Sequence, residues 1–300
     1  MDGGTMTPRA YLPHDRLVAP ARRRPELWRL LAGLMLVATT AFGLNMVLWS
    51  LLRGMAPDYW DATAIAGNRP GAMLAVLASF AFVTLGVGMA ARALHDRSLL
   101  SLIGPVPEAL LQFWRVFRLL LALGVLVLLL PPYDMGAPMQ PNLPLSRWLL
   151  LLPASLLVVL IQTSAEEILF RGYLQQQLAA RFRSPLIWAV VPSVLFAAGH
   201  YVPAEAGPNA PLVAAWAGLF GLLMADLTAR AGTLGPAIAV HMFNNITSLL
   251  LFSTPGQLNG LALYLLPYDL SDSEGILPWL AVDFVSIILT WLAARVAIRR

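Results

Sequence analysis

The chain has 300 residues, of which 58% are hydrophobic and only 12% are charged, and its mean hydropathy is +0.70. Soluble domains carry about 25% charged residues, so the composition excludes an ordinary soluble protein and predicts an integral membrane protein. The net charge is +4, and the basic residues are spread between apolar stretches, which argues against nucleic acid as a partner. Cysteine is absent, which excludes disulfides, thiolate metal sites and a cysteine nucleophile.

Eight apolar stretches approach the length of about 20 residues that a helix needs to span a membrane. We place them at 27–52, 71–94, 113–131, 148–170, 185–201, 211–229, 233–253 and 276–297. The fifth stretch is short, and Pro192 is expected to bend it. The sequence therefore predicts an all-α fold, a polytopic membrane helix bundle of about eight transmembrane helices, with seven or nine as the alternatives.

Residues 1–26 precede the first span and are polar, proline-containing and rich in arginine. We interpret them as a flexible, cytosolic N-terminal tail, and 27–300 as a single transmembrane domain. Arginine favours the cytosolic side of membrane proteins. With the N-terminus inside, seventeen arginines fall on that side and only Arg53, Arg69 and Arg147 on the other. This bias predicts that both termini are cytosolic, in a lipid bilayer that we expect to be a bacterial inner membrane.

The fourth span ends in Glu166-Glu167, and Arg171 follows one helical turn later. A charged side chain at the centre of a bilayer costs about 2.5–3.5 kcal/mol, so three of them close together require an explanation. Glu167 and Arg171 are four residues apart and share a helix face, where they can form an ion pair. Glu166 is rotated by about 100° and is free to point elsewhere. The alternative, an interfacial helix end, accounts for the arginine but poorly for two glutamates.

Two further polar patterns lie in later spans. Phe196 is one turn before His200 near the end of the fifth span, where Gly199 is expected to permit close helix approach. His241 and Asn245 share a face of the seventh span. Each pattern alone is explained as readily by hydrogen bonding between helices. Three of them in one bundle predict a polar reaction centre inside the membrane.

Taken in order, the three patterns resemble the signature EExxxR, FxxxH and HxxxN of the CPBP family (CAAX proteases and bacteriocin-processing enzymes, also called Abi). Here they read Glu166-Glu167…Arg171, Phe196…His200 and His241…Asn245. The resemblance covers 148–254, about a third of the chain, which we interpret as the catalytic core. It implies an intramembrane endopeptidase, similar to type II CAAX prenyl endopeptidases, that acts on a peptide or protein substrate, including a membrane-anchored one.

The resemblance also implies a role for each residue. Glu166 would act as the general base, with His200 as its partner in activating a water molecule. His241 and Asn245 would donate hydrogen bonds to the oxyanion that develops on the scissile carbonyl. The positions that would orient the site or pack its wall are Glu167, Arg171 and Phe196.

The sequence leaves open whether a metal takes part. Glu166, His200 and His241 form a set of two histidines and one carboxylate with an open position for water, which suits Zn²⁺. The family is described both as metalloproteases and as glutamate-type proteases. We favour water activation by Glu166 and His200 without a metal, because the second histidine and the asparagine then serve as oxyanion donors.

Two other classes of protein stay as alternatives. One is a bacteriocin-immunity or membrane scaffold protein that cleaves nothing, although a scaffold needs neither paired glutamates nor two histidines. The other is a proton-coupled transporter, which also uses intramembrane glutamate and histidine. The chain shows no internal repeat of the kind on which many transporters are built.

Overall fold

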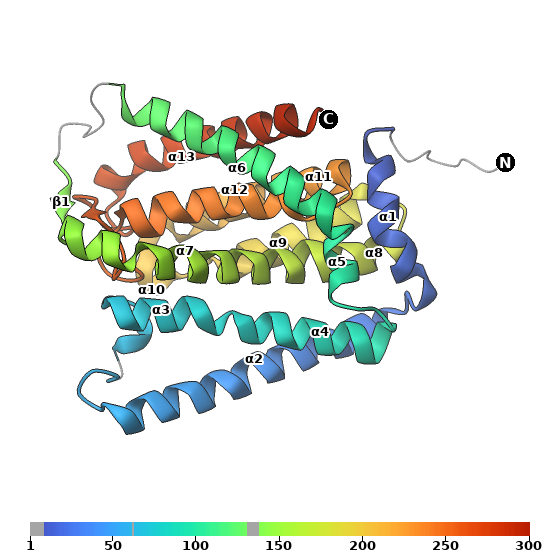
Figure 1. Cartoon of the computed structure of the whole chain (residues 1–300), viewed down its shortest axis with the longest axis horizontal. Coiled ribbons are helices and arrows are strands. Elements are labelled where there is room, and N and C mark those ends of the chain that lie inside the picture. The colour runs from blue at the N-terminus through green and yellow to red at the C-terminus, as the bar shows by residue number, and fades with distance from the viewer. Residues whose placement is uncertain (1–8, 62, 131–137) are drawn as a thin grey trace.

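Long helices lie side by side along the long axis of the molecule, and the short helices α1 (Asp15–Val18), α5 (Leu100–Ile103) and α8 (Gln175–Arg181) lie at one end (Figure 1). The computed structural model describes residues 9–61, 63–130 and 138–300. Its first half contains the 3₁₀ helices η1 (Arg9–His14), η2 (Ala19–Arg23) and η3 (Ala64–Ala66), and the α-helices α1 (Asp15–Val18), α2 (Leu27–Met55), α3 (Pro70–Ser79), α4 (Ala81–His95), α5 (Leu100–Ile103) and α6 (Val106–Leu128).

The second half begins with one continuous helical run: α7 (Leu145–Glu167), the π-helical η4 (Ile168–Leu174) and α8 (Gln175–Arg181). The π-helical η5 (Leu186–Val190) leads into α9 (Val191–Gly199). The remaining helices are α10 (Pro203–Ala206), η6 (Gly207–Asn209), α11 (Ala210–Ala231), α12 (Gly235–Asn245), the π-helical η7 (Ile246–Leu251) and α13 (Ser273–Ile298). Three two-residue strands, β1 (Gln140–Pro141), β2 (Phe252–Ser253) and β3 (Tyr264–Leu265), form a small sheet in the order β1-β3-β2, with β1 antiparallel and β2 parallel to β3.

The predicted helical membrane bundle is confirmed, and the number of spans is refined. Within the described residues, six helices are long and apolar enough to cross a membrane: Leu27–Met55, Pro70–His95, Val106–Leu128, Leu145–Arg181, Pro203–Ala231 and Ser273–Ile298. The predicted spans 185–201 and 233–253 are helical but shorter, as Leu186–Gly199 and as α12 with η7. The third span starts at Val106 rather than at 113, and Pro105 and Pro107 lie at the beginning of α6; proline is favoured in the first turn of a helix.

The surface of the bundle is suited to lipid. Large apolar side chains point outward along the long helices, for example Leu31, Phe42 and Leu150, which are 63%, 70% and 80% exposed. The interior is apolar around Phe220, Met224 and their neighbours. A soluble monomer rarely exposes such continuous apolar surface, so the distribution agrees with the membrane class inferred from composition.

The expectation of a flexible tail is wrong for residues 9–24. This segment folds into η1, α1 and η2, with Leu17, Val18 and Ala21 almost fully buried. It packs on α8 and on the end of α11, and Tyr11 donates a 2.7 Å hydrogen bond to Asp226 of α11. The apolar residues interspersed among the arginines explain the difference, because burying them offsets the entropy of ordering the segment.

Candidate active site

Glu166 and Glu167 occupy the last turn of α7, immediately before the π-helical turn η4. Single π-helical turns within α-helices are frequent at functional sites. Side-chain exposure is 15% for Glu166 and 0% for Glu167. Consecutive residues of a helix point in different directions, and the two carboxylates approach different nitrogens of one histidine, His241.

The Glu167 carboxylate is bound by two side chains, Arg171 and His241. Its Oε1 accepts a hydrogen bond of 3.0 Å from Arg171, so the predicted ion pair is confirmed. The same oxygen lies 2.8 Å from Nδ1 of His241 on α12. Arg171 is 1% exposed, donates to the carbonyl of Gly221 on α11 at 3.2 Å, and lies over the ring of Phe196. Glu167 and Arg171 therefore join α7, α9, α11 and α12 at one point.

The Glu166 carboxylate faces the other nitrogen of the same histidine. Its Oε2 lies 3.5 Å from Nε2 of His241 and has no hydrogen-bond partner within the described structure, although it is buried. Its Oε1 accepts a 2.8 Å hydrogen bond from Gln162, one turn earlier on α7. An unsatisfied buried carboxylate oxygen is costly, and functional groups are a common reason for such an exception.

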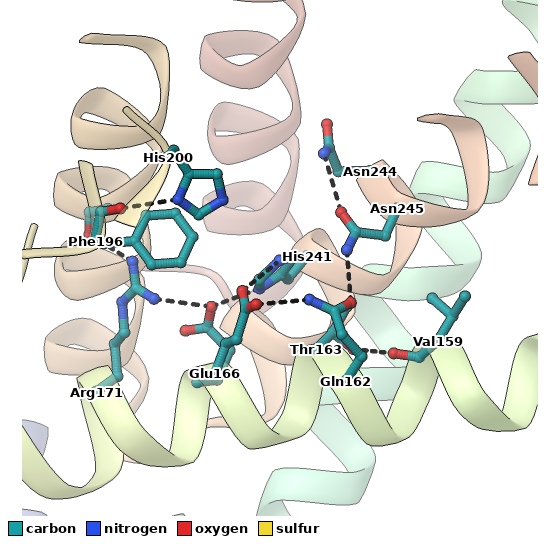
Figure 2. A network of polar contacts seen from close by, with 12 residues as sticks. Val159, Gln162, Thr163, Glu166, Arg171, Phe196, His200, His241, Asn244 and Asn245 are labelled. Atoms are coloured by element: carbon teal, nitrogen blue, oxygen red, sulfur yellow. Dashed lines mark hydrogen bonds and ion pairs between the residues drawn. The ribbon is translucent and has the colours of Figure 1, made fainter. Parts of the chain in front are cut away.

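Gln162 connects Glu166 to the third sequence pattern, as Figure 2 shows. Its Oε1 accepts a 2.7 Å hydrogen bond from Asn245, which in turn accepts one from Asn244 at 3.3 Å. The sequence analysis missed Gln162. Its signal was a polar residue in an apolar span, four positions before Glu166 and hence on the same helix face.

His200 lies at the end of α9 and joins the site through Phe196. Its Nδ1 is 2.8 Å from the carbonyl oxygen of Phe196, and the two rings are 4.4 Å apart between centroids. Because a carbonyl only accepts, Nδ1 is the protonated nitrogen and Nε2 of the neutral ring is an acceptor. The Phe196 ring also contacts His241, with centroids 6.2 Å apart. In the part of the chain that the structure describes, no hydrogen bond links His200 directly to Glu166 or His241.

The helix that carries the two glutamates is longer than the predicted span 148–170. It continues to Arg181 as a run of 37 residues, about 55 Å at 1.5 Å per residue. The carboxylates thus lie well inside the helix. α9 with η5 is only 14 residues long, about 21 Å, too short to cross a core of about 30 Å. Its early end lets His200 reach the interior of the bundle.

The charges of the cluster balance when His241 is protonated. Glu166 and Glu167 supply two negative charges and Arg171 one positive charge. Since a carboxylate only accepts, Nδ1 of His241 donates to Glu167, and a second proton on Nε2 would face Glu166. A buried cluster of net charge zero is far less costly than one that carries a charge.

Gly199 does not serve the packing role expected of it. A Cβ atom at this position would have no heavy atom within 4 Å. The close approach of α9 and α11 occurs at Gly221 instead, where a Cβ atom would lie 2.9 Å from that of Ser193. Small residues at helix contacts are typical of membrane bundles, but the sequence did not indicate which glycine provides this one.

The proposed zinc ligands are not assembled as a set. Among the described residues, no group of three histidine, cysteine, aspartate or glutamate side chains is arranged to hold a metal ion. His241 faces Glu166. His200 is connected to His241 only through the ring of Phe196, which has no atom that binds a metal. The residues in this arrangement do not fit a three-ligand zinc site, so no step below involves a metal.

Residues 147–247 match the family model described as "Type II CAAX prenyl endopeptidase Rce1-like". The resemblance drawn from the three sequence patterns is thereby confirmed, and the matched segment contains all seven of their residues together with Gln162.

A relative in Bacillus subtilis has no described activity. The chain is 29% identical over 178 residues to YyaK of Bacillus subtilis (strain 168), which is described as an uncharacterized protein. The match covers 56% of this chain and 56% of the relative, so it spans about half of that protein's length. No solved structure matches the chain significantly.

Proposed function

We propose that this protein is an intramembrane endopeptidase that hydrolyses a peptide bond of a membrane-associated protein or peptide. The observation that carries the proposal is the buried Oε2 of Glu166, which lies 3.5 Å from His241 without a hydrogen-bond partner, beside a Gln162–Asn245 hydrogen-bond network. The Rce1-like match supports the protease class. The name of the matched family further suggests a prenylated CAAX substrate, which we include as one probe.

In this mechanism, Glu166 takes a proton from a water molecule that attacks the scissile carbonyl. Its free Oε2 is the accepting atom, and Gln162 holds the other oxygen in place. His200 presents Nε2 as a second acceptor that orients the same water, because Nδ1 is engaged by the Phe196 carbonyl. The proton on Glu166 is then available for the leaving amine.

His241 and Asn245 stabilise the tetrahedral intermediate as hydrogen-bond donors. The Nδ2 group of Asn245 uses one hydrogen for Gln162 and keeps the other for the oxyanion. Nε2 of His241 donates only when the ring is doubly protonated, and the two glutamates balance that charge. Glu167 and Arg171 position His241 and do not touch the substrate. Phe196 positions His200 through the contact between their rings.

Removal of metal ions distinguishes water activation by Glu166 and His200 from catalysis that depends on zinc. Purified protein that has been dialysed against a chelator is expected to keep its peptidase activity and to contain less than one equivalent of zinc. Activity that is lost with the metal and restored by Zn²⁺ would contradict water activation by Glu166 and His200 alone.

We further propose that the protein resides in a bacterial inner membrane with both termini in the cytosol. The distribution of arginines supports this orientation. A cysteine-reactive, membrane-impermeant label tests it, applied to variants with single cysteines at the exposed positions Arg16 and Asp58, since the chain has no cysteine of its own. In intact cells the label should reach position 58, in the first outside loop, and should reach position 16 only after the membrane is opened.

The activity is tested with the full chain in liposomes and two quenched fluorescent peptides, one farnesylated at a C-terminal CAAX motif and one with the same sequence unmodified. Wild type is expected to cleave, and Glu166→Ala and His200→Ala to reduce turnover by about 100-fold or more. Glu108→Gln serves as the control, because Glu108 pairs with Arg16 on the surface. Equal turnover in wild type and both variants would refute the assignment.

A second experiment separates the peptidase from the scaffold and transporter alternatives. Membrane proteomes are compared between cells that produce wild type and cells that produce Glu166→Gln. Protein fragments that accumulate only with wild type support proteolysis. A phenotype that survives Glu166→Gln without any fragment favours a scaffold, and uptake driven by a pH gradient into vesicles favours a transporter.

A further inference from the structure

A basic pocket lies at the end of the bundle that carries the N-terminal segment, away from the Rce1-like site. Its volume is about 420 Å³, and it is formed between the segment 16–23 and the connection from α4 to α5. The polar side chains that line it are Arg16, Arg23, Asp96, Arg97, Ser98 and Ser101.

Arg97 is the buried charge of this pocket. It is 3% exposed, and its bonds go to neutral acceptors: the Gln176 amide at 2.7 Å, Ser101, and the Leu17 carbonyl at 3.3 Å. Its Nη1 has no hydrogen-bond partner, and none of the ion pairs in the described structure includes it. A buried charge without a counter-ion is strongly unfavourable, so this atom indicates a missing anion.

Burial lowers the pKa of Arg97 to about 10, chiefly through desolvation. The guanidinium is therefore still charged at neutral pH, and neutralisation does not remove the cost of burying it.

The backbone holds Arg97 rigidly. α4 ends with Asp96 in the left-handed conformation (φ 55°), and the Arg97 N–H donates to the carbonyl of Ala91 in the last turns of the helix at 2.9 Å. Gln176 and Ser101 then hold the guanidinium from two sides. A donor fixed in this way binds an anion with little loss of side-chain entropy.

Two exposed arginines add positive charge at the mouth of the pocket. Arg16 is paired with Glu108 at 3.1 Å, whereas Arg23 makes no ion pair with any described residue. The acidic residue of the lining, Asp96, is within 3.4 Å of Arg92. The lining therefore keeps an excess of positive charge.

The position of the pocket indicates which anions can reach it. α2 begins at Leu27 and α4 ends at His95, so the pocket lies where two candidate spans leave the hydrocarbon core. Lipid phosphates lie at this level, and soluble phosphates reach it from the aqueous side. Arginine forks recognise phosphate oxygens through paired hydrogen bonds.

We propose that Arg97, Arg23 and Arg16 form a binding site for a phosphate group, carried by an anionic lipid or by a soluble phosphate. The site is independent of the proposed peptidase activity. The guanidinium of Arg97 faces the phosphate, Ser98 offers its hydroxyl group, and Arg23 closes the mouth.

The lipid source is tested by native mass spectrometry of the full chain, purified with an equimolar mixture of phosphatidylglycerol and phosphatidylcholine. Wild type is expected to retain phosphatidylglycerol preferentially, and Arg23→Gln and Arg97→Gln to lower this retention by about tenfold. Arg22→Gln is the matched control, because Arg22 is a neighbouring exposed arginine that pairs with Asp15 outside the lining.

The soluble source is tested by thermal unfolding of the same proteins in inorganic phosphate against chloride of equal ionic strength. A phosphate-specific rise of Tm in wild type and Arg22→Gln, but not in Arg23→Gln, assigns the site to a soluble phosphate. Lipid retention without that rise assigns it to a headgroup. If Arg97→Gln fails to fold, the comparison of Arg23→Gln with wild type decides the outcome. The proposal is overturned if Arg23→Gln and wild type behave alike in both assays.

Discussion

The carboxylate of Glu167 lies 2.8 Å from Nδ1 of His241, although the two residues are 74 positions apart in the chain. The same oxygen accepts a hydrogen bond from Arg171 at 3.0 Å, and the glutamate is fully buried. One charge therefore stabilises two buried donors on two helices. Its removal affects both the fold and the proposed chemistry.

We predict that Glu167→Gln lowers the free energy of unfolding by about 3 kcal/mol, because the buried Arg171 loses its counter-ion. Peptide cleavage is expected to fall as well, since His241 loses the carboxylate that accepts a hydrogen bond from its Nδ1. Thermal unfolding in detergent and turnover in liposomes measure the two effects. Glu26→Gln removes an exposed partner of Arg29 and should leave Tm unchanged. Equal Tm values for Glu167→Gln and wild type would contradict the structural role.

Gln162 is predicted to position Glu166 and Asn245 for the reaction. Gln162→Leu keeps a similar volume but removes both hydrogen bonds, and we expect kcat to fall by about 100-fold through misplacement of the two groups. KM should change little. Thr163→Val is the neighbouring control, because the Thr163 hydroxyl bonds only to backbone carbonyls of α7. A loss of kcat in Thr163→Val of the same size would show that the helix itself had been disturbed.

The contact between α12 and α6 depends on Gly235. A Cβ atom there would overlap the carbonyl group of Ala109, and backbone atoms cannot move aside as a flexible side chain can. Gly235→Ala is expected to destabilise the protein by about 3 kcal/mol and to shift the helix that carries His241. Gly199→Ala meets no atom within 4 Å and should leave Tm unchanged or raise it slightly. Thermal unfolding of both variants tests this contrast. Equal Tm values for Gly235→Ala and Gly199→Ala would contradict it.

The docking of residues 9–24 is predicted to weaken in mild acid. Burial, and to a smaller extent Arg22, lower the pKa of His14 from 6.5 to about 4, against an opposing effect of Asp15. Above pH 6.5 the ring is neutral in both states, and its contribution to docking is complete. As the pH falls from 6.5 towards 4, only the undocked state gains a proton, which costs the docked state up to about 3 kcal/mol.

Hydrogen–deuterium exchange measures this effect. After correction for intrinsic rates, residues 9–24 should exchange faster at pH 5 than at pH 7.5, while residues of α13 in the same sample should not. In His14→Gln the difference between the two pH values should disappear, because glutamine does not titrate. A pH effect of the same size in His14→Gln would assign the change to another group.

The residues of the site were visible in the sequence because of where they occur. A glutamate or histidine in an apolar span is conspicuous, and four-residue spacing on a helix reveals which pairs share a face. For this reason Glu167 and Arg171 were paired correctly, and the segment 148–254 agrees closely with the Rce1-like match at 147–247. Gln162 escaped notice because an uncharged amide is less costly in a span and stands out less.

Composition and local spacing determined the membrane class, the helical fold, the family and the residue types of the site, since each depends on residues close together in the chain. The tertiary structure decided that α7 continues to Arg181, that α9 ends early enough to bring His200 to the interior, and that the N-terminal segment folds against α8 and α11. It also decided that His241 lies between both glutamates while His200 approaches through Phe196. These outcomes depend on how helices distant in sequence pack together, and local patterns carry no information about that packing.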